Sequence, residues 1–171
     1  MRHMMLTRTV ALILGTAFFA CGGDKEPEAD AAPLMTFDTA RVRIVSKSDT
    51  IPLVVELAKT NEQRTMGLME RTRLADSAGM LFMYDAMQPA NAGFWMFRTK
   101  IPLDIAFADS AGVIRSIRNM VPCTTGMASQ CPTYEPGARY QFALEVNAGF
   151  FGRRRIGVGD RVIVADTVKR R

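Results

Sequence analysis

The sequence is poor in histidine: the one residue of this type, His3, lies in an apolar and basic segment at the N-terminus. If that segment is removed on export, the mature protein keeps no histidine. This excludes Ser-His-Asp and Cys-His catalysis, imidazole-based zinc sites and general acid–base chemistry by histidine. An enzyme of this composition would have to use carboxylates, lysine, tyrosine or a serine activated by lysine.

Long hydrophobic runs are also scarce, and the one clear example is Val10–Ala20, an uncharged stretch of eleven residues. A helix that spans a bilayer needs about 20 residues, so this run is too short to cross one. Arg2 and Arg8 supply the positive charge that precedes the apolar core of a secretory leader. The pattern predicts a signal peptide over residues 1–20 and therefore an exported protein.

Cysteine is rare and odd in number, with three residues in the chain. Cys21 follows Ala20 directly after the apolar run, which resembles the lipid-acceptor box of bacterial lipoproteins, although Phe18 and Phe19 are atypical for such a box. The alternative is an ordinary leader cut near Ala17. Acylation would remove the odd thiol, so we predict lipidation at Cys21 and a membrane-anchored protein that faces the periplasm or the cell exterior.

The other two cysteines, Cys123 and Cys131, flank a short loop of seven residues. Exported proteins fold in oxidising compartments, so this pair predicts a disulfide. A zinc site would need four ligands, and a redox-active pair usually has the tighter Cys-x-x-Cys spacing. We therefore expect neither a metal nor a cofactor.

The anchor, the tether and the folded domain are separated by composition. Residues 21–34 combine the predicted lipidated cysteine with an acidic, proline-containing tether that should not fold. A single domain is expected over residues 35–168, followed by a basic tail at 169–171. Basic clusters such as Arg153–Arg155 fit either anionic lipid headgroups or a solvated surface. Export argues against a nucleic-acid partner.

The pattern of apolar residues predicts a mainly β, barrel-like antiparallel sheet with two short helices. One helix should begin after Thr60, because Thr60 and Gln63 form a capping box, and a second is expected at Ala148–Arg155. The expected strands are Arg41–Val45, Ile51–Leu57, Gly79–Tyr84, Gly93–Phe97, Leu103–Ala108, Val113–Met120, Tyr140–Val146 and Arg161–Val164, with a loop from Val121 to Ala138.

Five sequence blocks resemble the DUF192 family, a family of unknown function. They are Gly67–Met69, Gly79–Phe82, Phe94–Met96 with Ile101–Ile105, Ala143–Gly149 and Gly159–Asp160. The resemblance covers residues 42–164 and implies a compact, mainly antiparallel β fold, with no activity attached. One departure is visible, because Phe97-Arg98-Thr99 stands where the family usually has Lys-Asn-Thr.

Two lone carboxylates lie within apolar strands, Asp104 between Leu103 and Ile105, and Glu145 between Leu144 and Val146. Side chains alternate along a strand, so each acid should point away from its neighbours. The strand face that carries each acid is exposed to solvent, or each acid pairs with an arginine such as Arg64 or Arg71. Alternatively, both acids line one pocket and form a carboxylate pair suited to polysaccharide hydrolysis.

Three further side chains are candidates for ligand binding: Trp95, Arg98 and Arg64. An aromatic cluster around Trp95 is usually core, but an outward Trp95 would offer a stacking platform for sugar or peptide. Methionine is frequent over residues 66–96, and thioethers bind Cu(I), although methionine also fills core gaps.

These observations favour a noncatalytic binding or envelope-maintenance module. Its expected partners are membrane lipid, through Cys21, and a cell-wall polymer or envelope protein. The alternatives are a carboxylate-based envelope hydrolase that uses Asp104 and Glu145, and a Cu(I)-binding protein. The oligomeric state does not follow from the sequence.

Overall fold

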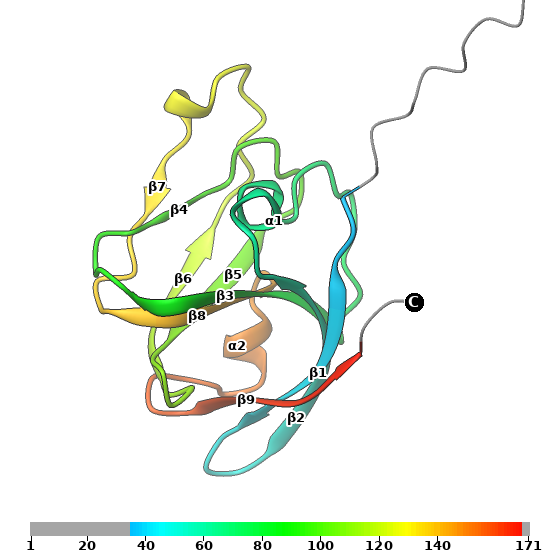
Figure 1. Ribbon diagram of the computed structural model, residues 1–171, viewed down its shortest axis with the longest axis vertical. Coiled ribbons are helices and arrows are strands. Elements are labelled where there is room, and N and C mark those ends of the chain that lie inside the picture. Colours follow the sequence, from blue (N-terminus) through cyan, green and yellow to red (C-terminus); the bar gives the residue numbers. More distant parts are fainter. Residues whose placement is uncertain (1–34, 169–171) are drawn as a thin grey trace, which may run out of the picture. The chain divides into compact units, whose positions relative to one another are not determined.

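The computed structural model describes residues 35–168, which form a curled β-sheet with short helices (Figure 1). The predicted mainly β, barrel-like fold is confirmed. The strands are β1 (Asp38–Val45), β2 (Thr50–Ala58), β3 (Ala78–Gln88), β4 (Phe94–Trp95), β5 (Leu103–Ala108), β6 (Ile114–Met120), β7 (Thr133–Tyr134), β8 (Tyr140–Asn147) and β9 (Arg161–Val168). The helices are α1 (Asn61–Met66), α2 (Phe150–Arg153) and a 3₁₀ turn at Ala128–Gln130. Within residues 35–168, no helix is long and apolar enough to cross a bilayer.

Within the described chain, seven strands form one sheet in the order β6-β5-β8-β3-β2-β1-β9, and β4 pairs with β7 in a separate ribbon. Neighbouring strands of the large sheet are antiparallel, except that β2 and β3 run parallel. Parallel neighbours need a long crossover connection. Residues 59–77 supply it, and they carry α1 over one face of the sheet.

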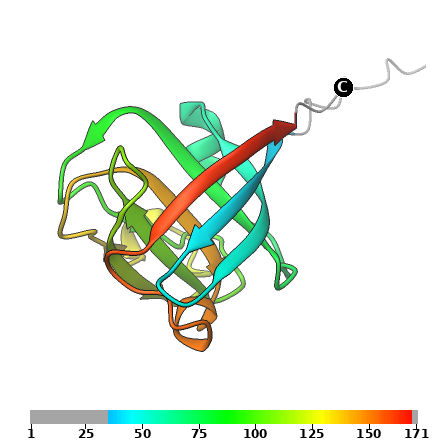
Figure 2. The ribbon, with the colours of Figure 1, turned by 90° about the horizontal axis from the view of Figure 1, so that it is seen from below.

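The sheet curls until its two edge strands meet at one end (Figure 2). The amide of Ile114 donates to the carbonyl of Asp160 at 2.8 Å, and the amide of Val162 donates to the carbonyl of Gly112 at 2.8 Å. Gly112 has φ of +77°, and a β-carbon there would come 2.2 Å from the Val162 carbonyl oxygen. Only glycine therefore allows this close approach of the edges.

Both faces of the central strands are covered. Inside the curl, apolar side chains pack against Phe150 and Phe151 of α2, which Figure 1 shows within the curve of the sheet. On the outer face of β3, β5 and β8, a second core includes Phe82, Ile105 and Phe107, beneath the β4–β7 ribbon and the segment after α1. All six residues of β5 are buried as a result.

The short elements differ from the prediction in their lengths. The capping box at Thr60 and Gln63 is present, and α1 begins where it was expected. The second helix is shorter than predicted, because Gly149 (φ +76°) and Arg155 (φ +54°) take left-handed conformations that a helix cannot contain. The predicted strand at Gly93–Phe97 reduces to β4, since the chain turns at Arg98 (φ +56°). The predicted loop from Val121 to Ala138 contains β7.

Candidate functional site

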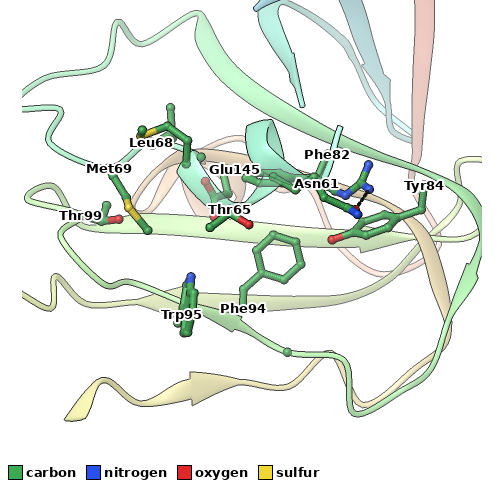
Figure 3. Close-up of a pocket in the computed structure, with 14 residues that line it drawn as sticks. Asn61, Thr65, Leu68, Met69, Phe82, Tyr84, Phe94, Trp95, Thr99 and Glu145 are labelled. Carbon is green, nitrogen blue, oxygen red and sulfur yellow. Dashed lines mark hydrogen bonds between the residues drawn. The ribbon is translucent and has the colours of Figure 1, made fainter. Parts of the chain in front are cut away.

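A pocket of about 390 Å³ lies between α1 and β4, over strands β3 and β8 (Figure 3). Its volume falls within the range of about 300–1,000 Å³ that is typical of small-molecule sites. The lining residues come from α1 and the turn after it, from the strands and from the loop after β4: Asn61, Arg64, Thr65, Met66, Gly67, Leu68, Met69, Phe82, Tyr84, Gly93, Phe94, Trp95, Thr99 and Glu145.

Glu145 is the one acidic residue in this lining, and it is 4% exposed. Its place on β8 is opposite Met80 on β3 and Ile105 on β5, so apolar side chains flank it on both sides. No hydrogen bond from the described residues reaches its carboxyl group, and burial alone raises its pKa to about 8. Among the described residues, only Ser116 Oγ is both fully occluded and unpaired. The Glu145 carboxyl group is therefore open to the pocket.

Arg64, a predicted ligand-binding residue, lines the same pocket but is already engaged. Its guanidinium donates to the backbone carbonyls of Lys59 and Met83 and to the side chain of Asn61. It also lies 4.7 Å from the centre of the Tyr84 ring, which is a cation–π contact. Arg64 thus fastens α1 to β3 and does not pair with Glu145.

Aromatic rings form much of the wall opposite α1. Phe82 and Phe94 meet edge to face with ring centres 4.9 Å apart, and Figure 3 shows the Phe94 and Trp95 side chains rising from β4 toward α1. Phe82 is buried, whereas Trp95 is 46% exposed. Trp95 is therefore available to a ligand at the edge of the pocket, as the outward alternative for this residue requires.

The second candidate carboxylate, Asp104, does not join Glu145. Asp104 lies opposite Val146 in the β5–β8 register, and Glu145 lies opposite Ile105, so the two acids point to opposite faces of the sheet. Asp104 is buried and accepts a hydrogen bond from the Asn119 amide at 2.8 Å. Neither acid pairs with an arginine, since Arg71 forms its ion pair with Glu56.

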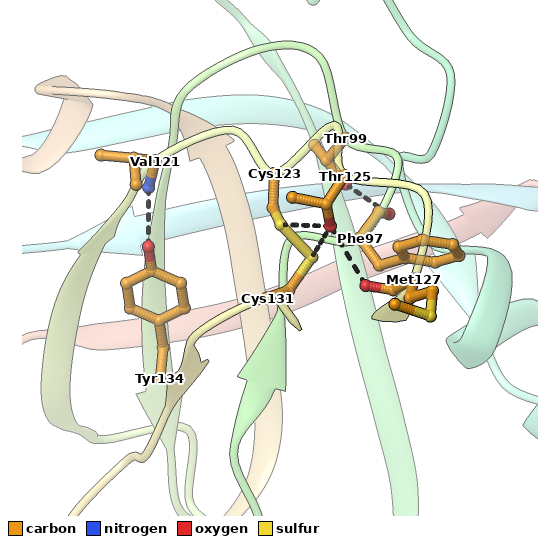
Figure 4. Close-up of a disulfide and its surroundings, with 8 residues drawn as sticks. All are labelled: Phe97, Thr99, Val121, Cys123, Thr125, Met127, Cys131 and Tyr134. Carbon is orange, nitrogen blue, oxygen red and sulfur yellow. Dashed lines mark hydrogen bonds between the residues drawn. A yellow bond between two sulfur atoms is a disulfide. The ribbon is translucent and has the colours of Figure 1, made fainter. Parts of the chain in front are cut away.

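The predicted disulfide is confirmed: Cys123 and Cys131 are joined, with Cα atoms 5.8 Å apart (Figure 4). The loop that it closes contacts the segment after β4, where the amide of Arg98 donates to the carbonyl of Cys123 at 2.8 Å. Thr99, which lines the pocket, also bridges to Cys123. The disulfide thus braces one wall of the pocket.

Arg98, the third candidate ligand residue, lies outside the pocket lining. Its side chain pairs with Glu70 at 2.6 Å, and Lys100 pairs with the other oxygen of the same carboxylate. Arg98 takes a left-handed conformation (φ +56°), which is uncommon for a residue other than glycine. Its side chain is therefore held on the surface by the ion pair with Glu70 and not in the pocket.

Four methionines between residues 66 and 96 lie in the core or in the pocket. Met80 and Met96 are buried in the outer core, while Met66 and Met69 line the pocket. Among residues 35–168, no group of three or more histidine, cysteine, aspartate or glutamate side chains is placed to hold a metal ion. Cys21 lies outside the described residues.

Sequence reasoning did not single out most of the pocket. Tyr84, Thr65 and Thr99 come from three separate segments, and only the fold brings them together. A wider hollow of about 770 Å³ lies over β1, β2 and β9, but its polar residues, including Arg41 and Asp166, are exposed. The α1–β4 pocket is therefore the candidate site, because it alone of the two holds a buried carboxyl group.

The sequence and the fold are similar to those of known proteins. The DUF192 family, described as "Uncharacterized ACR, COG1430", matches residues 43–164. A crystal structure from Sinorhizobium meliloti 1021, described as a putative transcription regulator, is 34% identical with a TM-score of 0.69, over 76% of this chain and 96% of that one. A protein of unknown function from Novosphingobium aromaticivorans DSM 12444 is 31% identical with a TM-score of 0.68, over 82% of this chain and 99% of that one. No curated protein sequence matches. The five sequence blocks, the fold and these matches agree, and the chain belongs to the DUF192 family.

Proposed function

We propose that the chain is an exported, lipid-anchored binding protein that takes one group of a cell-envelope ligand into the α1–β4 pocket and performs no chemistry on it. The observation that supports this most is the Glu145 carboxyl group, which is buried, open to the pocket and without a hydrogen-bond or ionic partner among residues 35–168. Buried polar groups in proteins are almost always hydrogen-bonded, and a ligand would supply the missing partner.

The pocket has the composition of a binding site. Apolar walls from Phe82, Phe94 and Leu68 surround a few polar groups, which is the usual arrangement in small-molecule sites. Trp95 adds a half-exposed aromatic surface at the edge. Tryptophan in this position suits a ligand that has both apolar and polar parts, such as a sugar or a peptide.

The predicted leader and Cys21 support a location at the cell envelope, where cell-wall polymers are available as ligands. A location at the cell envelope does not suit a transcription regulator, which is the description of the Sinorhizobium meliloti protein. Mass spectrometry of the purified full-length protein tests the anchor. A mature N-terminal peptide that begins at an acylated Cys21 is expected, and an unmodified N-terminus at another residue would contradict it.

Two alternatives have less support. A hydrolase that uses a carboxylate pair needs both acids beside one scissile bond, and Asp104 and Glu145 point to opposite faces of the sheet. Copper binding needs several thioethers around one point, and Met80 and Met96 are enclosed in the core. The pocket therefore supports the binding of an organic ligand better than it supports hydrolysis or copper binding.

A titration with soluble peptidoglycan fragments tests the proposal. Trp95 is the single tryptophan of the chain, so its fluorescence reports directly on the pocket. A saturable change is expected in the wild type and in Val158→Ala, which alters an exposed residue outside the lining. The change should be lost in Glu145→Gln, and the fragments should keep their mass. Absence of a saturable change, or cleavage of the fragments, would refute the proposed binding role.

A further inference from the structure

We infer that the group taken by the α1–β4 pocket is an organic ammonium cation, held by the Glu145 carboxylate beside the rings of Phe82, Phe94 and Trp95. This inference rests on the proposed binding function and adds the charge of the ligand. Carboxylates that are buried in proteins are paired with cations or metals, because leaving the charge unpaired costs several kcal/mol or more. Glu145 is 4% exposed, and no such partner contacts it in the part of the chain that the structure describes.

The protein offers no basic side chain that could complete this pair from the pocket lining. Arg64 is the basic residue there, and its guanidinium is held by the carbonyls of Lys59 and Met83. On β2, which lies on the far side of β3, Glu56 shares the face of Glu145 but is paired with Arg71 through both carboxylate oxygens, at 2.7 and 2.6 Å. Within residues 35–168, no basic side chain is therefore available to pair with the ionised form of Glu145, and a ligand cation could do so.

The remaining walls suit a cation as well. Aromatic faces attract ammonium groups through the negative charge density of the ring, and combinations of aromatic rings recognise quaternary ammonium ligands. Phe82, Phe94 and Trp95 all line the pocket with Glu145. The volume of about 390 Å³ admits a substituted ammonium group. A sugar, by comparison, would leave the Glu145 carboxylate without an opposite charge.

The charge state of Glu145 provides a signature for this ligand. Burial raises the pKa of Glu145 to about 8, so the empty pocket holds a neutral carboxyl group near pH 7. A bound cation would favour the carboxylate, and the Glu145 proton would pass to solvent. The other groups that face this region are the Tyr84 phenol, whose pKa burial also raises, the Arg64 guanidinium and the Glu56–Arg71 ion pair.

A matched pair of probes tests the charge. Choline and its neutral isostere 3,3-dimethylbutan-1-ol have the same shape, and choline carries no titratable ammonium proton. Isothermal titration calorimetry should show choline binding at least tenfold more tightly than the alcohol. Choline affinity should rise about tenfold per pH unit between about pH 5.5 and 7 and level off above pH 8, with one proton released per ligand at low pH.

Two variants complete the test. Glu145→Gln should abolish the preference for choline, whereas Val158→Ala, which alters an exposed residue outside the lining, should keep it. A thermal melt checks that both variants are folded. Propylammonium and Nα-acetyl-lysinamide then distinguish a free amine from the side-chain amine of a peptide, and the tighter ligand identifies the source.

Equal affinity for choline and the alcohol, no binding of choline, or unchanged choline affinity in Glu145→Gln would each overturn the inference. If peptidoglycan fragments still bound the wild type and not Glu145→Gln, the proposed binding function would survive without the cation. If neither kind of ligand bound, both the proposed binding function and the inferred cationic ligand would be refuted.

Discussion

Gly79 on β3 lies so close to the backbone of β8 that a β-carbon at this position would come 2.5 Å from the carbonyl oxygen of Glu145. Real β-carbons do not approach other atoms this closely, so the two strands can pack at this distance only because residue 79 has no side chain. The backbone of Glu145 is thereby held against β3. This contact sets the position of the carboxyl group in the pocket.

Replacing Gly79 by alanine should therefore destabilise the domain by about 2–3 kcal/mol, because the strands must separate. Urea unfolding measures this difference in the free energy of unfolding. Gly152→Ala is the matched control, since a β-carbon at Gly152 in α2 would meet open space. That variant should be neutral or more stable by up to about 1 kcal/mol. Equal effects of the two substitutions would contradict the close contact.

The stability of the domain should fall as the pH rises, because of Glu145. The pKa of a solvent-exposed glutamate, as in the unfolded chain, is 4.5, and the pKa of Glu145 in the folded protein is about 8. Below pH 4.5 the group is protonated in both the folded and the unfolded chain, and its full contribution is present. Between pH 4.5 and 8 the unfolded chain ionises first, which lowers the free energy of unfolding by about 1.4 kcal/mol per pH unit. Above pH 8 this decline ends.

Glu145→Gln isolates that contribution, because the other titrating groups remain. Urea unfolding at a series of pH values should show that the variant gains stability relative to the wild type as the pH rises from about 5 to 8. The total difference should reach several kcal/mol. A constant difference over this range would show that Glu145 has an ordinary pKa in the folded state.

The disulfide makes a prediction of its own. Closing so short a loop, eight residues in sequence separation, stabilises the folded state by about 2.5 kcal/mol in the loop-entropy treatment. The Cys123→Ser/Cys131→Ser double variant should lose about this much in urea unfolding. Reductant should cause a similar loss in the wild type and none in the double variant. A loss under about 0.5 kcal/mol would mean that the loop is held without the bond.

Local features of this fold could be predicted from the sequence. Thr60 and Gln63 are three residues apart and form the capping box by themselves, so the start of α1 follows from the sequence. The pairing of Cys123 with Cys131 follows from their short separation together with the predicted export. The family resemblance gave further support for a β fold. The family match over residues 43–164 confirms the resemblance.

Features that depend on distant contacts could not be predicted. Alternation shows that an acid points away from its neighbours, but it does not show which face is solvent. Here β5 and the second half of β8 are buried on both faces, so Asp104 on β5 and Glu145 on β8 are both enclosed. The parallel pairing of β2 with β3 depends on the path of the crossover. The pocket itself joins α1 to β4, which are about thirty residues apart in the chain.

The proposed binding function depends on Glu145 being a buried carboxyl group of the α1–β4 pocket that has no partner among residues 35–168. Carbon-13 NMR of the labelled side chain measures its titration directly, with Glu145→Gln to assign the signal. A pKa of about 8 is expected in the free protein, and a value below about 5.5 when choline saturates the pocket. A pKa near 4.5 in the free protein, unchanged by ligand, would contradict it.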